Sequence, residues 1–109
     1  MTIHIIIPVL NDLQKTKNII SCIRKQVIKE KIEIIVINDG SNDGTKEWLM
    51  SQKNIITLEG DGTLYWGGAI NLGVNFLIDN YSLNDWVIFI NNDVIINENY
   101  VQNLYNLAN

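Results

Sequence analysis

The chain has 109 residues and a mass of 12.5 kDa, which suits one small domain. Hydrophobic residues make up 47% of it and charged residues 18%, so we expect a packed globule and exclude a disordered chain. The formal net charge is −4 and the sequence has no Lys/Arg cluster, which argues against nucleic acid as a partner.

Apolar, β-branched segments alternate with segments of helical periodicity along the whole chain. Thr2–Pro8 indicates a strand buried on both faces, closed by a proline that lacks a backbone donor. Asn11–Val27 has a helical period, with Asn11 as the expected N-cap and Gln14 completing a capping box. Further strands are expected at Lys31–Asn38, Asn54–Leu58 and Asp85–Asn91, and further helices at Thr45–Gln52, Ala69–Asp79 and Glu98–Leu107.

This alternation predicts an α/β domain with a mainly parallel, Rossmann-like sheet and right-handed crossovers. The helical spacing places Val27 and Ile78 among the inward-facing residues. His4, Trp48 and Trp86 are expected to be packing residues of the core or the sheet edge.

Cys22 is the only cysteine, so an intrachain disulfide is excluded and a reducing compartment is favoured. The sequence shows no secretory signal, and the apolar run Ile3–Ile7 is far shorter than the roughly 20 residues that span a bilayer. We therefore expect a cytoplasmic location, with any association with the inner face of the membrane made through regions outside this chain.

In a parallel sheet the loops that follow the strands share one edge, and ligands bind there. Four unusual features fall on this edge: Pro8 with Asn11, the loop Asn38–Ser41, the glycine-rich Gly60–Gly68, and Asn91–Asp93. Their shared position predicts a ligand site at the carboxyl ends of the strands.

Of these features, Asn91–Asp93 most clearly indicates a particular kind of site. If the strand geometry persists, Asn91 and Asp93 point to the same side. A carboxylate beside amide oxygens suits a hard cation such as Mg²⁺ or Mn²⁺, whose shell the phosphate oxygens of a ligand would complete. The alternative is a simple turn, since Asn and Asp are turn residues.

Asp39 ends the second strand, where a carboxylate can accept a hydrogen bond from the ring N–H of uracil or thymine. The alternative is a helix or turn cap, although Asp43 has the more typical position for a cap. Gly40 lets the chain bend close to a ligand.

The segment Glu59–Gly73 combines glycines with Tyr65 and Trp66, which are expected at a loop tip. These aromatic rings could pack on a sugar or a base, or could instead cover the end of the sheet. Gly73 falls inside a predicted helix, where it costs roughly 1 kcal/mol against Ala, so close packing or ligand approach is expected there.

These motifs resemble the N-terminal half of family 2 glycosyltransferases of the GT-A fold. The resemblance rests on Pro8–Asn11, Asn38–Thr45, Gly67–Gly73 and Asn91–Asp93, in the family's order and over nearly the whole chain. The stretch GDGTLYWGGAINLG at Gly60–Gly73 resembles the rhamnosyltransferase-type branch, which hints at dTDP-rhamnose.

The resemblance implies that Asp39 contacts the base and that Asp93, with Asn91, binds Mn²⁺ or Mg²⁺. Asn38 stands where the family usually has an Asp, which removes one charge near the ribose or base. Only one carboxylate remains in Asn91–Asp93, so metal use is still expected but with modest affinity. The implied nucleotide-binding residues are Pro8, Asn11, Asn38, Asp39, Gly40, Ser41, Gly68, Asn71 and Asn92.

The implied function is transfer of a sugar from a UDP- or dTDP-sugar to a saccharide or lipid-linked acceptor, with inversion and with a metal ion. Residues 1–109 would form the donor-binding half of a truncated GT-A domain, and the catalytic base and acceptor site would lie beyond residue 109.

Other readings fit less well. The loop after the first strand has no glycine, although a nucleotidyltransferase, a dinucleotide-binding domain and a P-loop NTPase all need one there. A degenerate, non-catalytic scaffold remains the alternative of a different class, and the retention of Asp39 and Asp93 favours the active enzyme.

Overall fold

A computed structural model describes residues 1–81 and 84–108, and in this part of the chain strands and helices alternate strictly. All strands are parallel and their order in the sheet is β3-β2-β1-β4, which confirms the predicted α/β class. The strands are β1 (Thr2–Val9), β2 (Lys31–Asp39), β3 (Ile55–Gly60) and β4 (Trp86–Phe89), and the helices are α1 (Leu13–Arg24), α2 (Thr45–Met50), α3 (Tyr65–Asn80) and α4 (Tyr100–Ala108).

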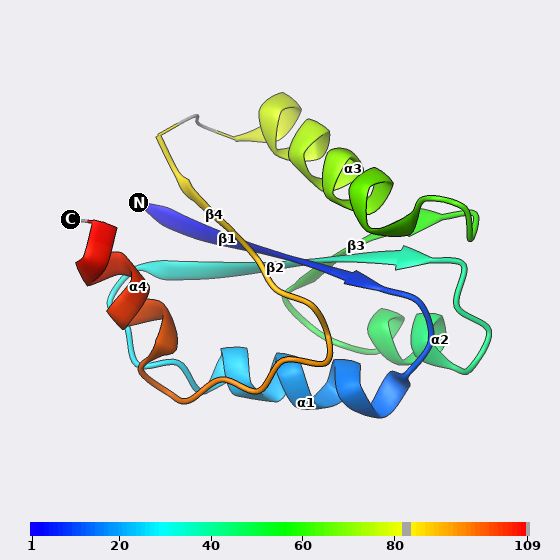
Figure 1. Cartoon of the computed structure of the whole chain (residues 1–109), viewed down its shortest axis with the longest axis horizontal. Helices are drawn as coiled ribbons and strands as arrows, with labels where there is room; N and C mark the ends of the chain where they lie inside the picture. The colour runs from blue at the N-terminus through cyan, green and yellow to red at the C-terminus, as the bar shows by residue number, and fades with distance from the viewer. Residues whose placement is uncertain (82–83, 109) are drawn as a thin grey trace.

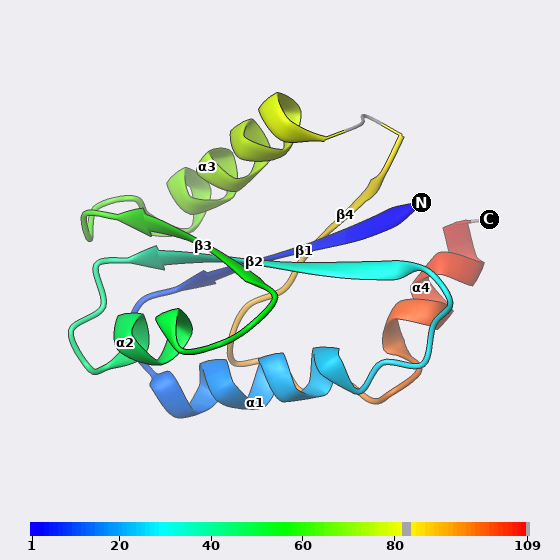
Figure 2. The ribbon, with the colours of Figure 1, turned by 180° about the vertical axis from the view of Figure 1, so that it is seen from behind.

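The sheet lies between two layers of helices. Helix α3 covers one face, and α1, α2 and α4 lie on the other face (Figures 1 and 2). Successive side chains along the central strands point to opposite faces of the sheet. On β1, Ile3, Ile5 and Ile7 face the layer of α1, whereas Ile6 faces α3.

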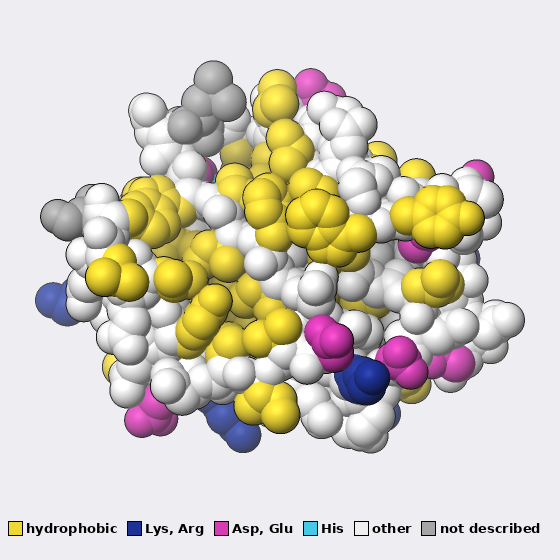
Figure 3. All heavy atoms as spheres, viewed as in Figure 1, with side chains coloured by type: hydrophobic (Ala, Val, Ile, Leu, Met, Phe, Trp, Pro, Cys, Tyr) yellow, Lys and Arg dark blue, Asp and Glu magenta, His cyan; other side chains and the backbone are white. Residues whose placement is uncertain are grey.

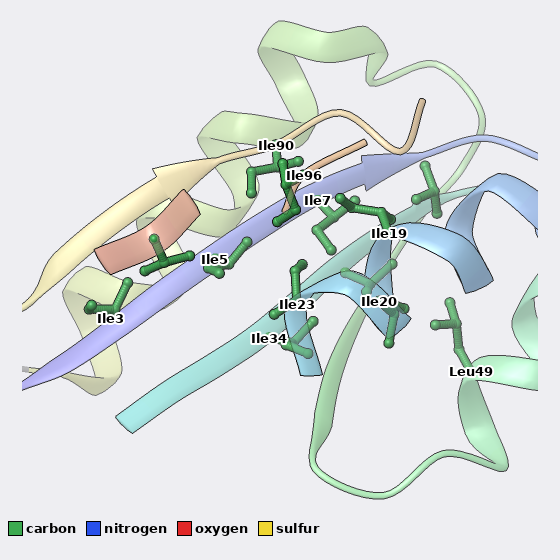
Figure 4. Close-up of a cluster of buried hydrophobic side chains, with 13 residues drawn as sticks. Ile3, Ile5, Ile7, Ile19, Ile20, Ile23, Ile34, Leu49, Ile90 and Ile96 are labelled. Atoms are coloured by element: carbon green, nitrogen blue, oxygen red, sulfur yellow. The ribbon is translucent and has the colours of Figure 1, made fainter. Parts of the chain in front are cut away.

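The larger core lies between the sheet and α1, where isoleucines dominate (Figure 4). Ile19, Ile20 and Ile23 of α1 pack against β1 and β2, and their spacing is that of one helical face. Each buried isoleucine contributes on the order of 1.5–3 kcal/mol relative to an exposed one, so this layer is a main source of stability.

Helix α3 contacts the sheet through Ala69, Gly73 and Leu77, one residue per turn. A Cβ at Gly73 would lie 3.0 Å from Ile6 Cδ1, so the glycine at this position is explained by close helix–sheet packing. Ile78 is 57% exposed, and its predicted inward orientation is wrong because the buried stripe of α3 is narrower than expected.

Helices α1 and α3 differ most from their predicted bounds, and α4 begins at Tyr100, two residues after the predicted Glu98. Helix α1 begins at Leu13, because Asn11 and Asp12 both adopt positive φ, and no side chain of its own caps it. It also ends at Arg24, which leaves Val27 outside the helix and 59% exposed. Helix α3 begins at Tyr65, so the prediction that Tyr65 and Trp66 lie at a loop tip is wrong.

Strand β4 is shorter than predicted and forms an edge of the sheet that is half exposed. Its pairing with β1 ends at Phe89, although Ile90 still donates its N–H to the carbonyl of Ile6. Val87 and Phe89 are exposed on this edge, which faces the viewer in Figure 1, and Figure 3 shows apolar side chains gathered over this face.

A partly buried polar network joins the strands at the edge where they begin. Nδ1 of His4 lies 3.0 Å from Oε1 of Glu33, and its Nε2 lies 3.0 Å from Oδ2 of Asp85. The Tyr81 hydroxyl donates to the other oxygen of Glu33, and its ring packs on the imidazole. The prediction that His4 is a packed histidine is confirmed, since its side chain is buried.

In the described part of the chain, no helix has the length and apolar character needed to cross a membrane.

Candidate functional site

A cleft of about 360 Å³ opens at the carboxyl edge of the sheet, between the ends of β1 and β4. The chain runs outward from β1 through β2 to β3, and then crosses to β4 on the opposite side of β1. The cleft therefore lies at the point where the strand order reverses, which is where open α/β sheets bind ligands. Its lining residues are Pro8, Val9, Leu10, Asp39, Tyr65, Trp66, Ala69, Asn91, Asn92 and Asp93.

Asp39, at the end of β2, is 5% exposed and lies at the base of the cleft. Its Oδ1 accepts the backbone N–H of Gly62 at 2.7 Å, and its Oδ2 accepts those of Leu64 and Tyr65 at 3.1 and 3.2 Å. The carboxylate therefore holds the loop before α3 and the first N–H groups of that helix. Oδ1 has one protein donor and keeps a second lone pair for a ligand.

Tyr65 and Trp66 form an aromatic rim in the first turn of α3. Tyr65 has a φ of +56°, which is rare for a residue with a side chain, and Asp39 holds its N–H in that position. Both rings are largely exposed, Tyr65 at 78% and Trp66 at 55%. The indole Nε1 of Trp66 donates to Oδ1 of Asn91 at 2.9 Å, which joins this rim to the loop after β4.

The segment Asn91–Asp93 forms a turn, so the extended geometry assumed for its side chains does not occur. The N–H of Val94 closes this turn on the carbonyl of Asn91. All three side chains still line the cleft. Asn92 Nδ2 donates to the hydroxyl of Thr16 on α1, and Asp93 is exposed.

The loops after β1 and β2 are fastened to each other beside the cleft. Ser41 Oγ accepts the N–H of Asn11, and Asn11 Oδ1 accepts that of Asn42. Asp43 accepts the N–H of Leu13 and so caps α1 from the neighbouring loop. Asn11 is therefore not the N-cap that was predicted, although it binds the adjoining loop.

Asp43 also accepts hydrogen bonds from the hydroxyl and the N–H of Thr45, at the start of α2. The hydroxyl of Thr45 lowers the pKa of Asp43, and the N–H groups of Leu13 and Thr45 add to this effect. The prediction that Asp43 is a cap is confirmed, and it serves two helices.

Gly40 brings the loop after β2 against the loop after β3. Its φ is +77°, and a Cβ at this position would lie 2.9 Å from the backbone N of Gly62. The close approach predicted for Gly40 is thus made to another loop of the protein.

Several predicted nucleotide-binding residues lie outside the cleft lining. Asn38 is buried, its Nδ2 faces Glu59 Oε1, and its Oδ1 has no hydrogen-bond partner. Gly68 packs near Leu64 within α3, and Asn71 is exposed on the next turn. Of the eleven-residue prediction, the cleft brings together Pro8, Asp39, Asn91, Asn92 and Asp93.

The chemical character of the cleft is acidic and amphipathic. Its lining has two carboxylates, those of Asp39 and Asp93, and contains no Lys, Arg or His. Within the described residues, no group of three or more His, Cys, Asp or Glu side chains could hold a metal ion. The protein therefore offers a cation one exposed carboxylate and amide oxygens, which are hard ligands but few.

Comparison with known protein families shows which family the chain belongs to. The sequence pattern of glycosyl transferase family 2 matches residues 4–109. The chain belongs to this family. The match covers nearly the whole chain, as the resemblance in its motifs implied.

One sequence relative and one solved structure are similar to this family 2 chain. It is 33% identical over 107 residues to glycosyltransferase GlyA of Streptococcus pneumoniae serotype 4, a match that covers 94% of this chain and 14% of GlyA. The crystal structure of S. aureus TarS 1–349 superposes with a TM-score of 0.71 at 20% identity, over 97% of this chain and 32% of that one. The chain thus has a GT-A-like fold and spans about a seventh of GlyA and a third of TarS 1–349.

The structure adds residues to the site that the motifs did not reveal. Val9 and Leu10 line the cleft because β1 continues past Pro8, and Ala69 lines it because α3 begins early. These apolar residues carry no chemical signal in the sequence. These residues reach the cleft only because α3 packs against the end of β1.

Proposed function

We propose that this chain binds a nucleotide-diphospho-sugar in the cleft between β1 and β4, as the donor site of a glycosyltransferase. The sugar would pass to a saccharide or lipid-linked acceptor with inversion at the anomeric carbon. The general base that accepts the acceptor's proton is assigned to no residue of this chain.

The observation that carries the proposal is the charge of the cleft. A diphosphate would approach Asp39 and Asp93, and no cationic side chain lines the cleft to offset their repulsion. Nearby N–H groups are already used, because Asp39 takes those that open α3, and Asp43 and Ser41 take those of Leu13 and Asn11. A divalent cation is the simplest group that makes such a cleft fit a diphosphate.

Asp93 and Asn91 would hold this cation, Mn²⁺ or Mg²⁺, with phosphate oxygens and water completing its shell. Because the chain supplies so few ligands, we expect the cation and the nucleotide to bind together and each to bind weakly alone. When bound, the ion would stabilise the charge of the departing diphosphate.

Asp39 would select the base. Its Oδ1 has a lone pair left after the N–H of Gly62, and the ring N–H of uracil or thymine can donate to it. Cytosine lacks that donor, so UDP and dTDP should bind better than CDP. The sequence GDGTLYWGGAINLG adds support for a dTDP-sugar such as dTDP-rhamnose, and the lone Cys22 supports a cytoplasmic setting.

The test is calorimetric titration of this chain with UDP, dTDP and CDP, with and without Mn²⁺. We expect binding of UDP or dTDP that depends on Mn²⁺, little binding of CDP, and a loss of about tenfold or more in Asp93→Ala. Asp79→Ala is the matched control, because Asp79 is exposed near the far end of α3.

Metal-independent binding would refute the metal assignment, and equal binding of CDP would refute the role of Asp39. If the folded chain binds no nucleotide under any of these conditions, the donor-site proposal fails and a non-catalytic scaffold becomes the better account.

A further inference from the structure

Gly60 ends β3 beside Asp39, and the two residues are paired across the sheet. The backbone φ of Gly60 lies outside the positive region that Gly40 and Gly62 occupy, so the backbone conformation here does not call for a glycine. Strands are otherwise poor in glycine, because a glycine has no side chain to pack. The glycine at this position is therefore explained by the space around it.

Two side chains fill the space that a side chain on Gly60 would need. A Cβ built on Gly60 would lie 2.6 Å from Oδ1 of Asp39 and 2.5 Å from Cδ1 of Leu64. Real Cβ atoms essentially never lie within 3.0 Å of such an atom, so both side chains would have to move if an alanine stood here. The missing side chain of Gly60 thus gives the carboxylate of Asp39 its place.

The place of this carboxylate is also fixed by the loop that follows β3. Gly62 donates its N–H to Oδ1 of Asp39 at 2.7 Å, and Leu64 and Tyr65 donate theirs to Oδ2. Because three backbone donors hold the carboxylate, it cannot move off Gly60 without lengthening at least one of these bonds. Such a movement would also turn the lone pair of Oδ1 that has no donor from the protein.

We propose that Gly60 is a positioning residue for recognition of the base, because its lack of a side chain lets Oδ1 of Asp39 rest against β3 with a lone pair directed to the base. This rests on the donor site proposed above, and it adds a residue that does not line the cleft. A site built to accept one donor discriminates against the analogue that lacks this donor. Displacement of Oδ1 should therefore cost more affinity for UDP than for CDP.

The first experiment follows the carboxylate without any nucleotide. In the ¹⁵N-labelled chain, the amide proton of Gly62 should resonate downfield, because it donates to a charged oxygen at 2.7 Å. Gly60→Ala should shift this proton upfield as the bond lengthens, whereas Gly67→Ala should leave it in place. Gly67 is the matched control, since a Cβ there meets no atom of the described residues within 4 Å. An unmoved Gly62 proton in Gly60→Ala would overturn the proposal.

The second experiment compares UDP with CDP by calorimetry in the same variants, with Mn²⁺ present. Gly60→Ala should weaken UDP binding about tenfold, the order expected for one hydrogen bond to a charged acceptor, and should weaken CDP binding much less. The preference for UDP should therefore shrink. A general loss of structure would weaken the binding of both nucleotides alike, so this preference is a readout that a merely structural role does not change.

A second variant separates the contact with Leu64 from the contact with Asp39. Leu64→Ala removes the atom that lies 2.5 Å from the added Cβ and leaves the contact with Oδ1 of Asp39. In this background, Gly60→Ala should still reduce the preference for UDP. Recovery of the full preference would assign the effect to Leu64 and would overturn the role given to Gly60.

Failure of the donor site itself gives a different result. If the wild-type chain binds neither nucleotide, or binds both equally well, the proposed contact between Asp39 and the base fails, and the role of Gly60 fails with it. If the wild-type chain prefers UDP and Gly60→Ala keeps that preference, the donor site stands and only the positioning role is refuted.

Discussion

Gly40 and Gly67 show how differently two glycines of one chain can be constrained. Gly40 has a φ of +77°, and a Cβ there would meet the backbone of Gly62, which cannot give way without moving a second loop. Gly67 lies in the first turn of α3, and nothing lies within 4 Å of a Cβ built on it. The first glycine serves the packing of two loops beside the cleft, and the second only lowers helix propensity.

We therefore expect opposite effects of the same substitution. Gly40→Ala should lower the free energy of unfolding by about 1–3 kcal/mol, since it adds a strained φ and a backbone clash. Gly67→Ala should raise it by up to about 1 kcal/mol through helix propensity. Urea denaturation of both variants tests this, and similar values for the two would contradict the loop-packing role of Gly40.

At the scale of elements, Asp39 joins β2 to α3 across the loop that follows β3. Helix α3 has no side-chain cap of its own at Leu64, and this carboxylate from another strand accepts its first N–H groups. The site thus depends on one buried side chain for two tasks, the position of the aromatic rim and the proposed contact to the base.

Asp39→Ala should lower the free energy of unfolding by about 2–4 kcal/mol, because three backbone N–H groups lose a charged acceptor. Asp39→Asn keeps one oxygen and should cost less. Asp93→Ala should leave stability nearly unchanged, because Asp93 is exposed. Denaturation curves recorded beside the nucleotide titrations separate these effects, and an unaffected Asp39→Ala would argue against the capping role.

At the scale of the molecule, the two ends of the sheet have different tasks. The carboxyl ends of the strands carry the cleft, and the opposite ends are tied by His4, Glu33, Asp85 and Tyr81. This network joins β1 and β2 to the chain segment between α3 and β4. It therefore holds the edge strand in register at a distance from the ligand site.

Because of this network, we expect the free energy of unfolding to fall both at acid pH and at alkaline pH. His4 donates to Asp85 and, with the N–H of Thr2, lowers the pKa of that carboxyl, so its contribution is present above about pH 4 and is lost as pH falls through the lowered pKa. The hydrogen bond to Glu33 raises the pKa of Tyr81, so its contribution is present below about pH 10 and is lost as the phenol ionises.

Urea denaturation across the pH range measures both limits. His4→Gln should reduce the loss of stability in acid and leave the part due to Asp43 and Asp61, whose pKa values are also lowered by neighbouring threonine hydroxyls. Tyr81→Phe should reduce the loss of stability at alkaline pH and leave the loss at acid pH unchanged. An acid side that is unaltered in His4→Gln would contradict the role given to His4.

The class of fold, the order of the elements and the edge that carries the site follow from local patterns. The run Ile34–Ile37 is apolar on both faces, as is typical of a strand buried between two layers of helices, and the loops after parallel strands share an edge. Pro8, Asp39 and Asp93 could be named as cleft residues for this reason.

Contacts between distant segments decided the rest. Asp43 caps α1 from another loop, Asp39 lets α3 begin at Tyr65, and Trp66 reaches Asn91 across the cleft. None of these bonds has a signature in local spacing, because the partners lie 25 to 30 residues apart in the chain and meet only once the loops have packed. The periodicity of the chain thus determines the scaffold, whereas tertiary packing determines which oxygens and rings are left to meet a ligand.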